Sequence, residues 1–268
     1  MKKAIFFDID GTLIDASVGM TLMSTRVRDA LNALKEAGNY IFIASGRPLD
    51  YLDPELVNFG FNGFVLMNGA VVVINNEVIF AEAIDPKVVK EVCQFCDAED
   101  TEYILESHPK VYLKEEFKLS EIFFANFDID ILKFERKFNI DDFPTYKMEF
   151  LTDRADAGEI YYKLLQTPTL TGINDPFHSD NLELYSAKNT KASGILHALD
   201  YLGVDIKDSY AFGDGLNDIE MIQTVGCGMA MGNGNPKLKS LAKYVVPSVH
   251  EDGVAFGIEN YILKAAVE

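Results

Sequence analysis

The fold and the chemistry of this chain are constrained most by one stretch, residues 6–13, with the sequence FFDIDGTL. Residues 4–7 form a short apolar run, which is typical of a parallel strand buried on both faces. The run ends in two aspartates, although carboxylates are costly to bury unless they are paired or bound to a metal. Because open α/β sheets bind ligands at the carboxyl ends of their strands, we expect Asp8 and Asp10 to point into a functional site.

The two aspartates predict either a bound cation between them or a proton on one of them. Two like charges about 4 Å apart repel by roughly 4 kcal/mol at an effective dielectric constant near 20. Both ways of relieving this repulsion suit phosphoryl transfer. Asp8 has the position of a nucleophile that forms an aspartyl-phosphate. Asp10, when protonated, can give its proton to a leaving alkoxide and later take one from the hydrolytic water.

A second acidic cluster follows another short apolar strand, residues 209–212. It has the sequence GDGLND and contains Asp214, Asn217 and Asp218. If the two strands are neighbours, Asp214 faces Asp8 and Asp10 across one crevice. Three carboxylates and a phosphate oxygen make an all-oxygen site that suits Mg²⁺.

Other polar residues are candidates to hold the remaining phosphate oxygens. Ser45 and Gly46 end a third apolar run and offer a hydroxyl and a backbone N–H group at a turn into a helix. Lys191 and Asn217 add a cation and an amide. For Lys191 the alternative is an ordinary solvated side chain in the first turn of a helix.

The composition limits the class of protein. The chain has 268 residues, of which 48% are hydrophobic, and a net charge of −18. So strong a negative charge makes nucleic acid or an anionic membrane surface an unsuitable partner. No secretory signal and no membrane-spanning stretch is expected. The three cysteines suit a reducing compartment, so the cytoplasm is the expected location, and the CxxC pair Cys93 and Cys96 is interpreted as core packing.

The pattern of apolar and polar residues changes twice along the chain. Residues 1–84 and 187–268 carry short, continuous apolar runs that alternate with helical periodicity, which predicts a mainly parallel α/β domain. Residues 85–186 alternate apolar and polar positions, which predicts an antiparallel sheet with helices on one face. The gap between Asp10 and Gly46 is too short for a domain. We therefore expect residues 85–186 to be an α+β domain inserted into the first domain.

Four motifs, in order, make the chain resemble the haloacid dehalogenase (HAD) superfamily, specifically the Cof-type phosphatases with a type IIB cap. They are DxDGT at residues 8–12, SGR at residues 45–47, Lys191, and GDxxND at residues 213–218. The segments NGA at residues 68–70, GN at residues 232–233 and EDGVA at residues 251–255 also resemble that subgroup. One small departure is Ala192, where the subgroup usually has glycine.

The resemblance implies a doubly wound, Rossmann-like core with an inserted C2B-type cap that determines substrate specificity. It implies Asp8 as the nucleophile, Asp10 as the general acid and base, and Mg²⁺ on Asp8, the Asp10 carbonyl and Asp214. Phosphate is then held by Ser45, Gly46, Lys191 and Asn217, with support from Asp218, Thr12 and Arg47.

The expected function is therefore Mg²⁺-dependent hydrolysis of phosphomonoesters through an aspartyl-phosphate, on sugar phosphates or other small phosphorylated metabolites. Two alternatives stay open. The first alternative is a phosphomutase, because phosphomannomutases share the DxDGT core and a similar cap. The fold would also serve a non-catalytic phosphate-binding protein, although every catalytic position is filled here. Neither the individual substrate nor the oligomeric state follows from the sequence.

Overall fold

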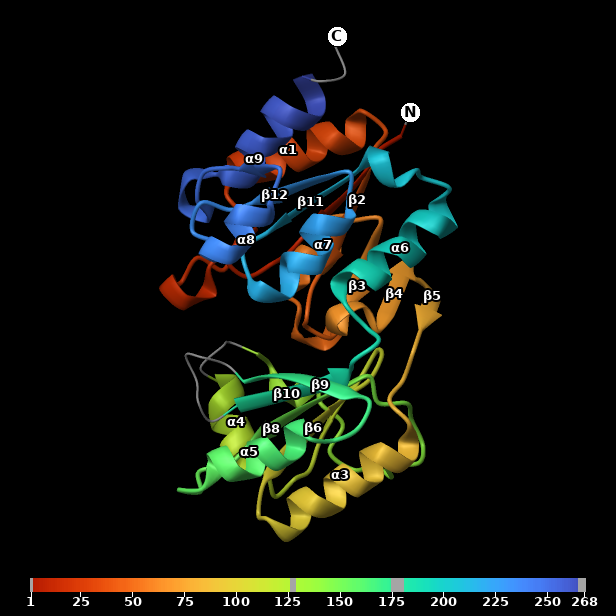
Figure 1. Ribbon diagram of the computed structural model, residues 1–268, viewed down its shortest axis with the longest axis vertical. Helices are drawn as coiled ribbons and strands as arrows, with labels where there is room; N and C mark the ends of the chain where they lie inside the picture. Colours follow the sequence, from red (N-terminus) through yellow and green to blue (C-terminus); the bar gives the residue numbers. More distant parts are fainter. Residues whose placement is uncertain (1, 126–128, 175–180, 265–268) are drawn as a thin grey trace. The chain divides into compact units, whose positions relative to one another are not determined.

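The computed structural model describes residues 2–125, 129–174 and 181–264. It divides into two compact units (Figure 1). The core unit comprises Met1–Gly46, Asp53–Phe80 and Thr190–Glu268, and the cap unit comprises Arg47–Leu52 and Ala81–Asn189. The expected divisions at residues 84/85 and 186/187 lie a few residues from these. The short segment Arg47–Leu52, which was expected in the core, groups with the cap unit instead.

The core unit contains an eight-stranded sheet among its described residues, with the order β13-β12-β11-β1-β2-β3-β4-β5. The strands from β13 to β3 pair in parallel, and β4 pairs antiparallel to β3. The predicted α/β fold with a mainly parallel core sheet is therefore confirmed. The strand bounds are β1 Ala4–Phe7, β2 Tyr40–Ala44, β3 Gly63–Leu66, β4 Val71–Ile74, β5 Glu77–Ala81, β11 Ser209–Gly213, β12 Cys227–Ala230 and β13 Tyr244–Val245.

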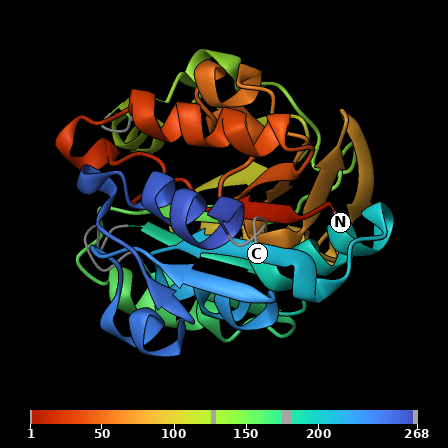
Figure 2. The same ribbon diagram turned by 90° about the horizontal axis from the view of Figure 1, so that it is seen from above.

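Helices cover both faces of this sheet (Figure 2). Alternate residues of β1 point to opposite faces, so Phe6 packs with α6, α7 and α8, while Ile5 and Phe7 point to the face of α1 and α9. All four residues of β1 are completely buried, as the apolar run predicts. The helix bounds are α1 Thr25–Glu36, α2 Pro54–Asn58, α6 Lys191–Leu202, α7 Ile219–Thr224, α8 Pro236–Leu241 and α9 Gly253–Gly257.

The cap unit contains a five-stranded antiparallel sheet in the part of the chain that the structure describes, with the order β7-β6-β8-β10-β9. One face packs on α3 and α5 through residues such as Leu105, Met148 and Leu184. The predicted antiparallel sheet is present, but the prediction of helices on one face is wrong, because α4 packs on the opposite face and β6 and β8 are buried on both sides. The bounds are β6 Glu102–Glu106, β7 Val111–Leu113, β8 Lys147–Leu151, β9 Leu170–Asn174, β10 Asn181–Ser186, α3 Pro86–Ala98, α4 Lys118–Ala125 and α5 Ala157–Leu165.

The opposite face of the cap sheet carries a second apolar cluster and a buried charged group. Tyr51 stacks against Phe134 and contacts Phe124, which explains why residues 47–52 group with this unit. The charged group is centred on the buried Lys147, whose Nζ lies 3.1 Å from Glu106 Oε1, 3.2 Å from Glu149 Oε1 and 3.1 Å from Glu183 Oε1.

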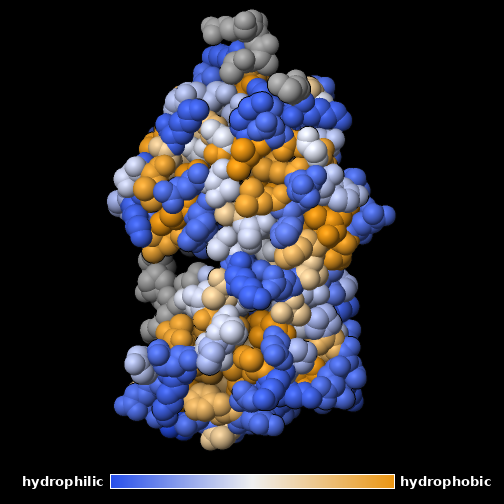
Figure 3. Space-filling view, turned by 45° about the vertical axis from the view of Figure 1, so that its right-hand side comes forward, coloured by the Kyte–Doolittle hydropathy of each residue, from blue (hydrophilic) through white to orange (hydrophobic). Residues whose placement is uncertain are grey.

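The surface mixes polar and apolar residues. On the face that Figure 3 shows, hydrophilic residues interrupt the apolar areas of both units, as on an ordinary water-exposed surface. Within the described ranges, none of the helices combines the length and apolarity needed to cross a membrane. Cys93 and Cys96 are free thiols buried in the apolar contacts of α3, which agrees with their interpretation as packing residues.

Candidate active site

The candidate site lies at the carboxyl ends of three neighbouring strands, β2, β1 and β11. In the parallel register, Phe7 of β1 pairs with Ile43 of β2 and with Phe212 of β11. All three strands end within one residue of these positions, so the loops that follow leave the same edge of the sheet. These loops begin with Asp8, Ser45 and Asp214.

Lys191 joins the two acidic motifs. Its Nζ lies 2.6 Å from Asp8 Oδ1 and 2.7 Å from Asp218 Oδ1, and its side chain is completely buried. The helix α6 begins at this lysine, and the Thr190 side chain caps the helix by accepting from the Ser193 backbone N–H. Burial alone lowers the pKa of a lysine, but the carboxylates of Asp218 and Asp8 outweigh it and hold the pKa of Lys191 above its usual value. Lys191 is therefore a fixed positive charge inside the site.

Asp218 fixes the loop of the second motif. Its Oδ2 accepts hydrogen bonds from the backbone N–H groups of Asp214 and Gly215, each at 2.9 Å. Its Oδ1 accepts from Lys191, and the residue is completely buried. Because both oxygens are engaged, Asp218 orients the loop and the lysine.

The carboxylates of Asp8 and Asp214 are not fully compensated by the positive charge nearby. Burial raises the pKa of Asp8 well above its usual range, although the Lys191 ammonium opposes this effect. Burial and the charge of Asp218 raise the pKa of Asp214 to about 7. A divalent cation would supply the missing compensation.

The donor set fits such a cation. Carboxylate oxygens of Asp8, Asp214 and Asp218 lie within 4.8 Å of one another. Since Asp218 is committed to the loop and the lysine, Asp8 and Asp214 are the residues that could hold a metal ion. Oxygen ligands of this kind suit a hard cation such as Mg²⁺. The Asp10 side chain is not a member of this group, and the part of Asp10 in metal binding stays a prediction about its backbone carbonyl.

The loop after β1 depends on Gly11. Gly11 has a left-handed backbone, with φ of +75°, and a Cβ atom there would lie 2.2 Å from Asp214 Oδ2. Only glycine allows the two motifs to approach this closely. Thr12 Oγ1 donates to Asp214 Oδ1 at 3.3 Å, so the first motif also orients the second. Asp10 is exposed at the same loop.

Ser45 and Gly46 lie where β2 ends. The Ser45 N–H donates to the Val65 carbonyl at 2.8 Å, and the Ser45 carbonyl accepts from the Asn68 N–H at 3.1 Å. Asn217 lies half-buried in the loop of the second motif. These residues keep their predicted phosphate-binding roles as predictions. Arg47 differs, because it groups with the cap unit, where its guanidinium donates to the Tyr51 carbonyl at 3.3 Å.

Asn233 links two loops at this edge, although it was not among the predicted site residues. Its Nδ2 donates to the Gly11 carbonyl at 2.8 Å, and its Oδ1 accepts from the Val249 N–H at 2.9 Å. The sequence signal was present only as the GN pair in the resemblance. A surface asparagine after a glycine otherwise predicts no more than a turn.

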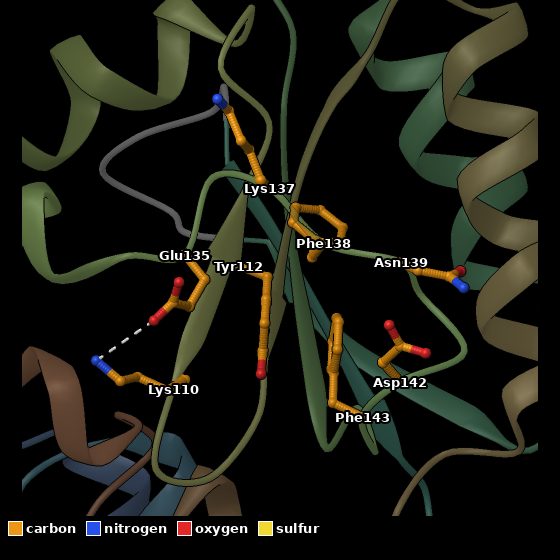
Figure 4. Close-up of a pocket in the computed structure, with 8 residues that line it drawn as sticks. All are labelled: Lys110, Tyr112, Glu135, Lys137, Phe138, Asn139, Asp142 and Phe143. Atoms are coloured by element: carbon orange, nitrogen blue, oxygen red, sulfur yellow. Dashed lines mark ion pairs between the residues drawn. The ribbon is translucent and has the colours of Figure 1, made fainter.

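The cap unit carries a separate hollow of about 240 Å³ (Figure 4). The rings of Tyr112 and Phe143 stack on each other there, with 3.5 Å between the ring centroids, so their faces are already in contact. The hollow also contains an ion pair of Lys110 and Glu135. It is lined by Lys110, Tyr112, Glu135, Lys137, Phe138, Asn139, Asp142 and Phe143. The acidic site of the core unit, with its buried lysine, is the better candidate for catalysis.

The chain matches the family model of the haloacid dehalogenase-like hydrolases over residues 5–258. It belongs to this family. YkrA of Bacillus subtilis (strain 168) is 32% identical over 97% of each chain. A second relative from the same organism, 5-amino-6-(5-phospho-D-ribitylamino)uracil phosphatase YcsE, is 26% identical over 97% of this chain and 96% of its own.

The family agreement extends to solved structures. The HAD subclass IIB sugar phosphatase BT4131 superposes with a TM-score of 0.81 at 26% identity, over 97% of this chain and 99% of its own. A structure from Thermotoga maritima gives a TM-score of 0.84 at 20% identity, which shows the shared fold. The assignment of the chain to the HAD-like phosphatases from its sequence motifs is thereby confirmed.

Proposed function

We propose that this HAD-family protein is a Mg²⁺-dependent phosphomonoester hydrolase that acts through an aspartyl-phosphate on Asp8. The observation that carries the proposal is the contact of the buried Lys191 with both Asp8 and Asp218, beside Asp214. It combines a carboxylate nucleophile, a fixed cation and a pair of oxygen ligands at the edge where parallel sheets bind their ligands.

In the first step, an Asp8 carboxylate oxygen attacks the phosphorus atom of the ester. The bond from phosphorus to the alcohol oxygen breaks, and its electron pair stays on that oxygen. Asp10 gives its proton to the departing oxygen, so that a neutral alcohol leaves. Lys191 orients Asp8, because the ammonium is 2.6 Å away, and its charge favours the ionised carboxylate against the effect of burial. A divalent cation on Asp8 and Asp214 would reduce the repulsion between the carboxylate and the phosphate.

In the second step, water attacks the phosphorus atom of the aspartyl-phosphate. The Asp10 carboxylate accepts the proton of that water, and the Asp8 carboxylate leaves as inorganic phosphate forms. The N–H of Gly46, the Ser45 hydroxyl, the Asn217 amide and the Lys191 ammonium are the proposed donors to the phosphoryl oxygens. The exposure of Asp10 gives the alcohol and the water access to the acid and base.

The proposed substrates are sugar phosphates or similar small phosphorylated metabolites. Support comes from the similarity to a sugar phosphatase of HAD subclass IIB and to a phosphatase of a phosphoribityl compound. The strongly negative chain favours small substrates over nucleic acid. We also propose a cytoplasmic location, because the three cysteines are free thiols, as in a reducing compartment.

Phosphate release from a panel of sugar phosphates, nucleotides and phosphorylated cofactors tests the proposal, with Mg²⁺ and with EDTA. We expect release that EDTA abolishes, and a ranking of kcat/KM that identifies the substrate class. Conversion of one sugar phosphate into its isomer without free phosphate would instead establish a phosphomutase. Binding of these compounds without any turnover would establish a phosphate-binding protein.

A further inference from the structure

The turn between β3 and β4 has an unusual backbone. Met67 and Asn68 both have left-handed conformations, with φ of 49° and 53°. Residues other than glycine rarely adopt this backbone conformation, and two such residues in succession are energetically costly. Both residues are also buried. A strained turn that persists in a buried position requires a reason in the surrounding structure.

The carboxamide of Asn68 is buried without a hydrogen-bond partner. Asn68 is 3% exposed, and neither Oδ1 nor Nδ2 forms a hydrogen bond with the described residues. Buried polar groups are nearly always hydrogen-bonded, because leaving one unpaired costs free energy. By contrast, the left-handed Asn75 and Asn76 in the next turn are exposed to water. Asn68 therefore carries hydrogen-bonding capacity that the fold itself does not use.

This carboxamide lies against the predicted phosphate-binding loop. A Cβ atom built on Gly46 would lie 3.2 Å from Asn68 Oδ1 and 3.6 Å from Asn68 Nδ2. The backbone of the same residue donates to the Ser45 carbonyl at 3.1 Å. The Asn68 side chain is thus beside the Gly46 peptide, whose N–H is a proposed phosphate donor.

The same turn also touches the helix that carries Lys191. Gly69 has a φ of +92°, and a Cβ atom there would lie 2.0 Å from the Thr190 carbonyl oxygen and 3.2 Å from the Gly194 nitrogen. The turn of residues 67–69 therefore contacts two separate phosphate-binding elements. The close approach requires glycine at position 69, directly after the strained Asn68.

We propose that Asn68 is a further residue of the phosphate-binding site, donating from Nδ2 to the phosphoryl oxygen that the Gly46 N–H holds. The proposal rests on the function proposed above, which places a phosphoryl group at Gly46. Binding satisfies the carboxamide, and the strained turn holds it in position before the phosphate arrives. The free energy lost in burying the unpaired amide is recovered as affinity for the anion.

Inorganic phosphate with Mg²⁺ is the probe, and the readout is the rise of the melting temperature with phosphate concentration, which yields a Kd. Asn68→Gly keeps the left-handed backbone and removes the amide. Asn68→Asp keeps the shape and replaces the donor by a negative charge. Asn76→Gly is the matched control, since it makes the same change at an exposed left-handed position.

We expect the Kd for phosphate to rise about tenfold or more in Asn68→Gly, further in Asn68→Asp, and not at all in Asn76→Gly. Without phosphate, Asn68→Gly should melt no lower than the wild type, because it loses an unpaired buried amide. A lower melting temperature with an unchanged Kd would reduce Asn68 to a structural role and overturn the proposal.

The test separates this proposal from the hydrolase proposal, because it measures binding and not turnover. A wild type that binds phosphate but releases none from esters would refute the hydrolase alone, and the Kd of the variants would still decide the role of Asn68. A wild type whose melting temperature does not respond to phosphate would overturn the assignment of Asn68 to a phosphate site.

Discussion

Lys191 Nζ lies 2.6 Å from Asp8 Oδ1, inside the core unit and out of contact with solvent. The two residues are 183 positions apart in the sequence; Lys191 begins the helix α6, and Asp8 directly follows the strand β1. A buried ammonium is stable only because the carboxylates of Asp218 and Asp8 compensate for its burial. The ion pair therefore belongs to the fold and to the chemistry at once.

Replacing Lys191 should reduce both the stability of the fold and the catalytic activity. Lys191→Met leaves two buried carboxylates without their cation, and we expect a loss of about 3–5 kcal/mol in the free energy of unfolding. Phosphatase activity should fall to background in the fraction that folds. Denaturant unfolding measures the first effect and phosphate release the second. Lys207→Met is the control, because that exposed lysine pairs with Asp205 at the surface and its loss should change the free energy of unfolding little. Equal stability of the two variants would contradict this account.

A single methyl group at Gly11 should disrupt the site. Gly11→Ala places a carbon atom 2.2 Å from Asp214 Oδ2 and strains a left-handed backbone. We expect kcat/KM to fall by about 100-fold or more, because Asp214 must move from its position. Gly19→Ala has nearly the same backbone angle, with φ of +78°, but no atom within 4 Å of the new carbon. It should retain activity at a small cost in melting temperature. A similar loss of activity in both variants would assign the effect to backbone strain alone.

The charged group of the cap unit predicts a pH dependence of stability. Burial raises the pKa of Glu106 well above its usual value, against the opposing charge of Lys147. Such a carboxyl stabilises the fold below its unfolded pKa of about 4.3, and this contribution is lost as the pH rises through the folded pKa. Glu106→Gln cannot ionise, so it should melt about 2 °C or more above the wild type at pH 8, with a smaller difference at pH 5.

Scanning calorimetry at the two pH values measures this difference. Glu135→Gln is the control, since Glu135 is half-exposed and pairs with Lys110 at 3.8 Å. It should show no comparable gain at pH 8. A Glu106→Gln protein that is less stable than the wild type at pH 8 would mean that Glu106 is ionised and needed as a partner of Lys147.

Much of the site could be predicted because the signals are local. Short apolar runs that end in Asp8, Ser45 and Asp214 identify buried parallel strands, and parallel strands bring their carboxyl ends to one edge. The burial of Lys191 could not be derived in this way. A lysine in the first turn of a helix is ordinarily solvated, and only the tertiary packing of α6 places it between two carboxylates.

Two further features depend on long-range contacts that no local pattern encodes. Period-2 alternation identifies the cap strands, but it does not specify the register that puts Lys147 beside three glutamates. Arg47 follows the phosphate motif in the chain, yet its segment groups with the cap unit because Tyr51 packs on Phe134. The sequence of the segment shows no sign of this contact.

The central claim is that Asp8 becomes phosphorylated, and acid-quench mass spectrometry tests it most directly. The experiment uses Asp10→Asn with Mg²⁺ and an aryl phosphate, whose leaving group needs no proton, so that the second step is slowed more than the first. We predict an added phosphoryl group on the peptide that contains Asp8, and its absence in Asp8→Asn, which should also lose about 1,000-fold or more in turnover. Phosphate release with Asp8 unmodified throughout, or undiminished turnover in Asp8→Asn, would contradict the account.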